Sequence, residues 1–116
     1  MSLFIRDEEE NIYTAKIDGV EFVCEDVTPE FEKDAPALAK AYQDKLPQIA
    51  AFLMDDVTDM FGDITEEELT DALGTPQIDL DRGTITYLEH TLDDSHIIEV
   101  EYGGLLEEFF EVTIDG

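Results

Sequence analysis

Two histidines and the acidic pair between them are the side chains best suited by type to metal binding or acid–base chemistry. His90 and His96 flank Asp93-Asp94 near the C-terminal end of the chain. A zinc or copper site needs three or four ligands that converge at ~2.0 to 2.2 Å, whereas the chain has one cysteine and two histidines. The residue types do not supply the usual set of nitrogen and sulfur ligands. We therefore expect neither a metal nor another cofactor.

The pair Asp93-Asp94 is typical of a tight turn between two strands. A two-residue turn at this position would pair Tyr87 with Val100. It would also leave His90 and His96 on opposite faces of the sheet, because successive side chains of a strand point to opposite faces. The pattern therefore predicts a turn between charged strands.

A second acidic segment, "DLDRGTI" from Asp79 to Ile85, resembles a calcium-binding loop, because two aspartates precede a glycine and an isoleucine. The glycine is fifth in the segment rather than sixth. Glu89 falls at the eleventh position rather than the twelfth, so the bidentate carboxylate would be out of phase. Strand-like alternation surrounds the segment, and we predict a strand, a turn and a strand.

No motif for nucleophilic catalysis is present: the chain lacks Gly-x-Ser-x-Gly and a phosphate-binding glycine loop. Cys24 has no basic neighbour in the sequence to stabilise a thiolate, so it is predicted to be a small buried apolar residue. We predict no catalytic residue. An enzymatic or small-ligand domain, with a pocket between helix and sheet, stays open as an alternative.

The charge of the chain is its most unusual property. The 116 residues include 31 Asp and Glu but 6 Lys and Arg, which gives a formal net charge of -25. Nucleic acids and anionic membranes both attract basic side chains, so we expect neither as a partner. A basic protein is the expected partner. The alternative is that the charge serves solubility or adaptation to salt.

Length and cysteine content indicate one domain, residues 1–116, in the cytoplasm. With 43% hydrophobic residues the chain can bury one core. A single cysteine rules out an internal disulfide framework. The opening "MSLFIRDEEE" lacks the basic start and the long apolar run of a secretion signal.

The N-terminal part predicts a β-hairpin. Asp18-Gly19 is the signal for a type I′ turn, because both positions tolerate a positive φ. A two-residue turn sets Ile17 opposite Val20. Counting outward, it sets Tyr13 opposite Cys24, which leaves one apolar face.

The middle of the chain predicts a long helix followed by a short one. Apolar residues recur every three or four positions from Leu38 to Met60. Pro47 lies within this stripe and predicts a kink, or two helices on a shared axis. Thr65 and Glu68 form a capping box for the short helix, and a glycine follows it.

From Pro76 onward the hydrophobic period changes to two and predicts four more strands. Runs of strands separated from a run of helices indicate an α+β fold. We expect an antiparallel sheet built from an N-terminal β-hairpin and a C-terminal four-stranded meander. The long kinked helix and the short helix cover one face of it.

The last turn is predicted to be irregular. The apolar residues on the two sides of Gly103-Gly104 can share the core face only if the loop has three residues, "GGL", or a bulge. Phe109 then emerges on the outer face of the sheet beside Leu88 and Ile97. An apolar cluster on a charged sheet indicates a contact surface, and it could support a homodimer.

The segment "IDLDRGTITYLEHTLDDSHIIEVEYGGLLEEFFEVTIDG" resembles the end of small bacterial α+β domains, including those of the immunity-protein type encoded beside polymorphic toxins. The resemblance rests on the strand from His96 to Tyr102 and on the closing "FFEVTIDG". It implies binding without catalysis.

With the charge, this resemblance leads to the hypothesis of an acidic protein that binds and occludes a basic partner such as a toxin nuclease. Asp55 and Asp59 lie opposite the apolar stripe of the long helix and are the predicted acidic contacts. Leu88, Ile97 and Phe109 are the predicted apolar contacts.

Overall fold

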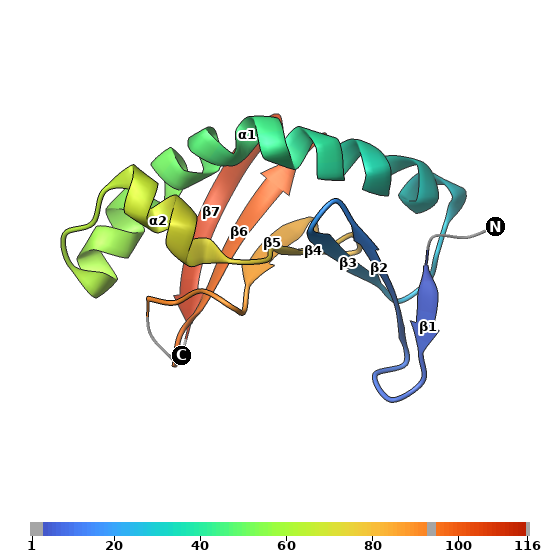
Figure 1. Cartoon of the computed structure of the whole chain (residues 1–116). Coiled ribbons are helices and arrows are strands. Elements are labelled where there is room, and N and C mark those ends of the chain that lie inside the picture. The colour runs from blue at the N-terminus through green and yellow to red at the C-terminus, as the bar shows by residue number, and fades with distance from the viewer. Residues whose placement is uncertain (1–3, 93–94, 116) are drawn as a thin grey trace.

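A computed structural model describes residues 4–92 and 95–115 of the chain. Seven strands form one sheet, in the same order as in the sequence, and α1 arches across one face of it (Figure 1). The elements are β1 (Ile5–Asp7), β2 (Ile12–Ile17), β3 (Val20–Cys24), α1 (Pro29–Phe61), α2 (Glu66–Leu73), β4 (Gln77–Asp79), β5 (Thr84–Tyr87), β6 (Ile97–Gly103) and β7 (Glu108–Asp115).

The α+β class is confirmed, but the sheet is mixed rather than antiparallel. Strands β3 and β4 run parallel, with Phe22 opposite Ile78. Both helices lie in the connection between these two strands, and such a long crossover lets the chain return in the same direction. The last four strands are adjacent and antiparallel, but they continue through β4 into the larger sheet.

Strand β1 is an addition that the sequence pattern did not predict. Ile5 pairs with Thr14 and Asp7 with Ile12. The acidic run that follows β1 resembles a solvated segment, so the sequence pattern gave no sign of a strand before it. Asp7 instead closes the turn, since its Oδ1 accepts hydrogen bonds from the backbone N–H groups of Glu9 and Glu10 at 3.0 and 3.3 Å.

The first hairpin has the predicted register. Asp18 and Gly19 have φ values of 50° and 81°, as a type I′ turn requires. Tyr13 lies opposite Cys24. The side chains of Val20, Phe22 and Cys24 are buried on the core face.

Helix α1 is a single helix that continues through both of its internal prolines. It begins after Thr28, whose Oγ1 accepts a hydrogen bond from the N–H of Phe31 at 3.1 Å, and it ends at Gly62. The ribbon arches over the sheet and is not divided into two helices (Figure 1). The predicted stripe is buried at Leu38, Tyr42, Ile49, Leu53 and Val57.

Met60 does not belong to the buried stripe, contrary to expectation. Leu53 and Val57 are separated by four residues, and a further step of four reaches Phe61 rather than Met60. Phe61 is partly buried against the core, whereas Met60 is exposed. Neither helix of the described chain is long and apolar enough to cross a membrane.

Helix α2 has the predicted capping box. The Oγ1 of Thr65 accepts from the N–H of Glu68 at 3.1 Å, and Glu68 accepts in turn from the N–H of Thr65 at 3.3 Å. Gly74 follows the helix with a φ of 73°. A Cβ at this position would lie 2.9 Å from the carbonyl oxygen of Glu89, so the close approach of two backbones also requires glycine.

The predicted register between β5 and β6 is wrong by two residues, because Tyr87 pairs with Ile98 rather than Val100. Strand β5 ends at Tyr87, and the segment that follows leaves the sheet. The N–H of Thr91 donates to the carbonyl of Ala72 in α2 at 2.8 Å, so this segment is held by the helix instead of by a strand ladder. The predicted turn at Asp93-Asp94 lies outside the described residues.

The predicted irregularity between β6 and β7 is a bulge within the strand ladder. Val100 pairs with Val112, but Tyr102 pairs with Phe109, so β7 has one extra residue between these pairs. The extra residue reverses which side chains face the core beyond it. Phe109 therefore packs against the core, and Phe110 is exposed.

Candidate functional site

The C-terminal half of α1 presents an exposed face that combines acids with apolar side chains. Phe52, Asp56 and Asp59 follow one another at helical spacing, with Asp55 and Met60 beside them. All five side chains are exposed. We call these five residues the acidic helix face. It lies on the part of α1 that is farthest from β1 (Figure 1).

The position of Asp59, the acid of this face nearest to the end of α1, is unfavourable for a carboxylate. Asp59 lies in the last turn of α1, which has no basic residue, and the partial negative charge at this end of a helix disfavours a carboxylate. Asp55, Asp56 and Asp59 form no ion pair with a described residue. In contrast, Glu66, Glu67 and Glu68 lie in the first turn of α2, where the dipole favours them.

The negative charge of the acidic helix face is not compensated by basic side chains that are close in the sequence. No Lys or Arg occurs between residues 46 and 81. An ion pair that the described residues do form joins Arg82 to Glu99 at 2.9 Å, on the sheet. The whole basic complement of the chain is Arg6, Lys16, Lys33, Lys40, Lys45 and Arg82.

The predicted apolar cluster of Leu88, Ile97 and Phe109 does not form. Leu88 and Ile97 are exposed, at 52% and 41%, as expected. Phe109 lies on the opposite face, where its ring centroid is 5.7 Å from that of Phe52 in α1. The bulge explains why Phe109 was predicted on the wrong face of the sheet. The irregularity was predicted in the turn, but it occurs inside the ladder between β6 and β7.

Phe110 does not replace Phe109 in that cluster. Its ring covers Gly103, since a Cβ on that glycine would lie 2.9 Å from two of the ring carbons. Gly103 and Ile97 are the two ends of β6. Phe110 and Ile97 therefore lie near opposite ends of β6.

The contact between Phe52 and Phe109 is the feature that sequence reasoning missed. Phe52 is 37% exposed and falls outside the buried stripe of α1. An aromatic residue on the polar side of an amphipathic helix was the available signal. It joins the acidic helix face to β7.

The two histidines are close together, contrary to the prediction that they lie on opposite faces. The ring centroids of His90 and His96 lie 6.1 and 5.8 Å from that of Phe61. The Nδ1 of His90 accepts from the N–H of Leu92 at 3.2 Å, and its Nε2 pairs with the carbonyl oxygen of His96 at 2.5 Å. His90 is therefore a buried residue that ties its loop together.

No group of three or more His, Cys, Asp or Glu side chains within residues 4–92 and 95–115 is placed to hold a metal ion. The segment that resembles a calcium loop forms the predicted strand, turn and strand. The Oδ1 of Asp79 accepts from the N–H groups of Asp81 and Arg82 at 3.0 and 3.1 Å. Asp81 accepts from the N–H of Glu25 at 2.6 Å, so both carboxylates hold the fold together.

Cys24 is buried on the core face of β3. Burial raises the pKa of its thiol to about 11, and the nearby carboxylates of Asp81, Asp79 and Asp26 act in the same direction. A thiol with a raised pKa is a poor nucleophile at neutral pH. This environment agrees with the predicted role of a small apolar residue.

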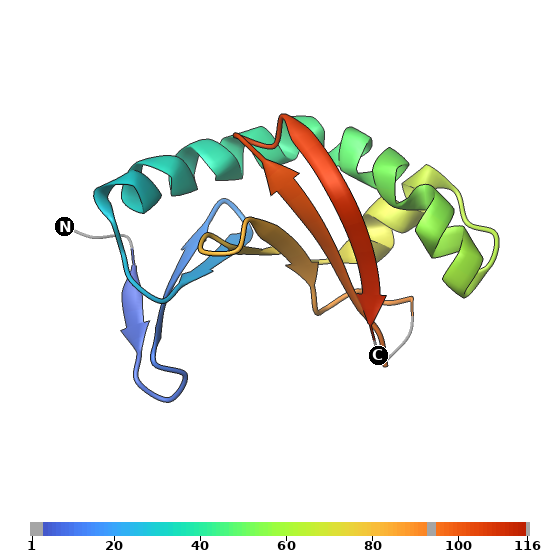
Figure 2. The same cartoon turned by 180° about the vertical axis from the view of Figure 1, so that it is seen from behind.

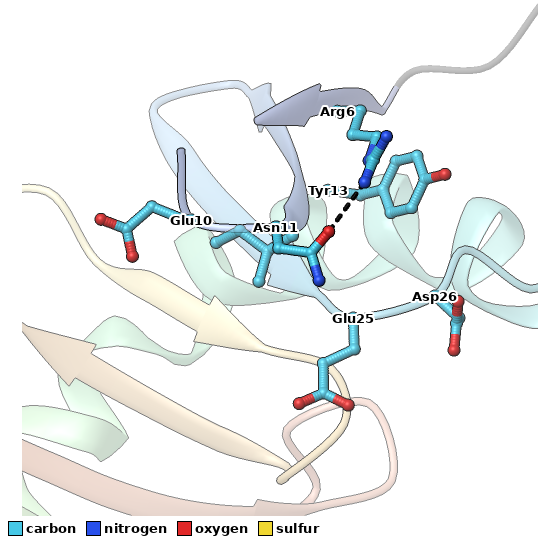
Figure 3. A pocket seen from close by; sticks show the side chains of 7 residues that line it. Arg6, Glu10, Asn11, Tyr13, Glu25 and Asp26 are labelled. Atoms are coloured by element: carbon cyan, nitrogen blue, oxygen red, sulfur yellow. Dashed lines mark hydrogen bonds between the residues drawn. The ribbon is translucent and has the colours of Figure 1, made fainter. Parts of the chain in front are cut away.

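A polar hollow of about 450 Å³ lies beside β1 and β2 (Figure 3). The Nη2 of Arg6 donates to the Oδ1 of Asn11 at 2.7 Å across one side of it. The carboxylates and the guanidinium share this exposed surface, and no side chain of α1 contributes. The lining residues are Arg6, Glu10, Asn11, Ile12, Tyr13, Glu25 and Asp26.

The layer between α1 and the sheet, where a ligand pocket was the open alternative, holds a buried tyrosine pair. The hydroxyl oxygens of Tyr42 and Tyr87 are 2.8 Å apart and share a hydrogen bond. Burial raises the pKa of Tyr42 to about 12 and holds that of Tyr87 well above its ordinary value. Both hydroxyls are therefore neutral at physiological pH.

No family model, curated protein or solved structure matches the chain. The features that distinguish this molecule physically are the uncompensated acidic helix face and the strand that it contacts, β7. Both belong to the surface and not to an enclosed cavity. Such an arrangement is suited to contact with another macromolecule.

Proposed function

We propose that this protein is a non-enzymatic acidic binding protein that recognises a basic partner protein in the cytoplasm, as an immunity-type inhibitor does with its toxin. The observation that carries the proposal is that Asp55, Asp56 and Asp59 are exposed near the end of a helix whose last turn has no basic residue, and that they form no ion pair with a described residue. The carboxylate of Asp59, in the last turn, opposes stability, and a basic partner would turn this cost into binding energy.

The apolar members of the acidic helix face support the same function. Phe52 and Met60 are exposed between the acids, at 37% and 48%. Interfaces are usually anchored by a few large apolar side chains within a charged surround. The face therefore combines contacts that hold a partner with charges that select a basic one.

Occlusion follows from this geometry if the partner is a nuclease. A nuclease presents basic side chains to the phosphates of its substrate. Carboxylates on the exposed face of α1 would occupy the same side chains. Substrate and inhibitor would then compete for one surface, and no catalytic step by this protein is needed.

Charge reversal on α1 tests the proposal, with the partner isolated by pull-down from the source cell and then purified. Asp55→Lys combined with Asp59→Lys should weaken binding by at least ~10-fold, because attraction becomes repulsion at the contact. Glu8→Lys combined with Glu9→Lys is the matched control, because it changes the net charge equally on the exposed turn between β1 and β2. Equal effects of the two double variants would show that the acidic helix face is not the contact.

A further inference from the structure

Strand β7 is an open edge of the sheet. One side of it pairs with β6, and no strand among residues 4–92 and 95–115 pairs with the other side. It runs along the outside of the molecule, as the view from behind shows (Figure 2). An edge strand presents unpaired backbone N–H and C=O groups that can accept another strand.

The two edges of this sheet differ in length. Strand β7 has 8 residues, whereas β1, at the other edge, has 3. A longer edge offers more backbone hydrogen bonds to an added strand. The β7 edge is therefore the better template.

The charge along β7 selects the strand that can be added. Glu108, Glu111 and Asp115 are exposed on β7, and the strand has no Lys or Arg. A second copy of β7 would bring like charges together across the new pair, which is destabilising. An extended segment that carries Lys or Arg would instead meet opposite charge at these positions.

An aromatic pair connects this edge to the acidic helix face. Phe109 in β7 and Phe52 in α1 lie with ring centroids 5.7 Å apart, and Phe52 is partly exposed. A strand beside β7 would extend the sheet at this contact. The apolar side chains of the added strand would contact the two rings on the core face of the sheet, next to the acidic helix face.

We propose that the basic partner binds by strand addition: an extended segment with alternating basic and apolar residues pairs with the open edge of β7 and packs on Phe52 and Phe109. This inference rests on the proposed function and specifies its binding mode. Backbone hydrogen bonds would supply affinity, and the acids would supply selectivity for a basic segment.

Two synthetic peptides test the binding mode. The first is a short peptide of alternating lysine and valine, and the second has the same sequence with N-methyl groups on its central residues. The two peptides carry equal charge, but the central residues of the second peptide cannot donate backbone hydrogen bonds to a strand on either side. We expect the N-methylated peptide to bind at least ~10-fold more weakly, and the first to slow amide hydrogen exchange in residues 108–115 rather than in β1.

The outcomes separate the two proposals. Equal binding of both peptides would overturn strand addition and leave charge recognition standing, whereas binding of neither would contradict both. Protection confined to β1 would also overturn the β7 assignment. Phe52→Ala should weaken binding of the first peptide by about 5-fold. Ile5→Ala, at the exposed opposite edge, is the control and should leave binding unchanged.

Discussion

The buried pair of Tyr42 and Tyr87 makes the stability of this protein sensitive to alkaline pH. Burial raises the pKa of Tyr42 from 10.0 to about 12 in the folded protein. Between these values the unfolded chain has lost the proton that the folded chain still holds. The stability that Tyr42 contributes is therefore fully present below pH 10 and is lost as the pH rises toward 12.

We predict that Tyr42→Phe reduces this alkaline loss. The full shift of Tyr42 corresponds to about 3 kcal/mol of unfolding free energy, of which about half is lost by pH 11. Urea unfolding at pH 9 and pH 11 measures the difference for both proteins. Parallel losses in the two proteins would contradict the account, because Tyr42 would then not be responsible.

His90 holds the loop after β5 through both of its ring nitrogens. We predict that His90→Ala lowers the unfolding free energy by about 1 to 3 kcal/mol, because the Leu92 N–H and the His96 carbonyl lose their partner. Thr91→Ala, at an exposed neighbouring position, should change it by less than about 0.5 kcal/mol. Denaturant unfolding measures both, and a negligible loss for His90→Ala would mean that the loop is held by other contacts.

At the scale of elements, α1 has one face that stabilises the fold and one that opposes it. We predict that Leu53→Ala lowers the free energy of unfolding by about 2 to 5 kcal/mol, because the leucine side chain is fully buried on the side of the helix that faces the sheet. Asp59→Asn should instead raise stability by about 0.3 to 1 kcal/mol, since it removes a carboxylate from the last turn. Thermal or denaturant unfolding of the two variants should give shifts of opposite sign. A loss at Asp59→Asn would contradict the dipole argument.

Local signals in the sequence predicted the elements whose geometry is local. Asp18-Gly19 set the register of the first hairpin, and Thr65 with Glu68 set the start of α2. The exposure of Asp55 and Asp59 followed from their phase relative to the buried stripe of α1. These features depend on residues within one or two turns of each other.

Long-range contacts decided the features that the sequence did not predict. The parallel pairing of β3 with β4 depends on a crossover through both helices. The segment after β5 leaves the sheet because Thr91 bonds to Ala72 in α2. Because of the bulge in β7, Phe109 contacts Phe52 instead of lying on the predicted outer face. The apolar part of the candidate site therefore lies at the edge of the sheet and not on its outer surface.

At the scale of the whole molecule, a net charge of -25 on 116 residues creates a long-range field. Charges of one sign repel each other within a Debye length of about 10 Å at 0.1 M salt. A basic partner relieves this repulsion and is attracted from a distance, so that association is fast at low salt. Charge that serves solubility alone would give no such dependence on a specific partner.

The association rate with the purified partner, measured by stopped flow from 50 to 500 mM salt, tests the central claim most directly. We predict that the partner is basic, and that the rate falls by at least ~10-fold over this range, as electrostatically steered encounters do. Asp55→Lys with Asp59→Lys should lower the rate at 50 mM salt and flatten its salt dependence, while the protein stays folded. An acidic partner, or a rate that stays constant across the range, would contradict the claim and assign the surplus charge to solubility or adaptation to salt.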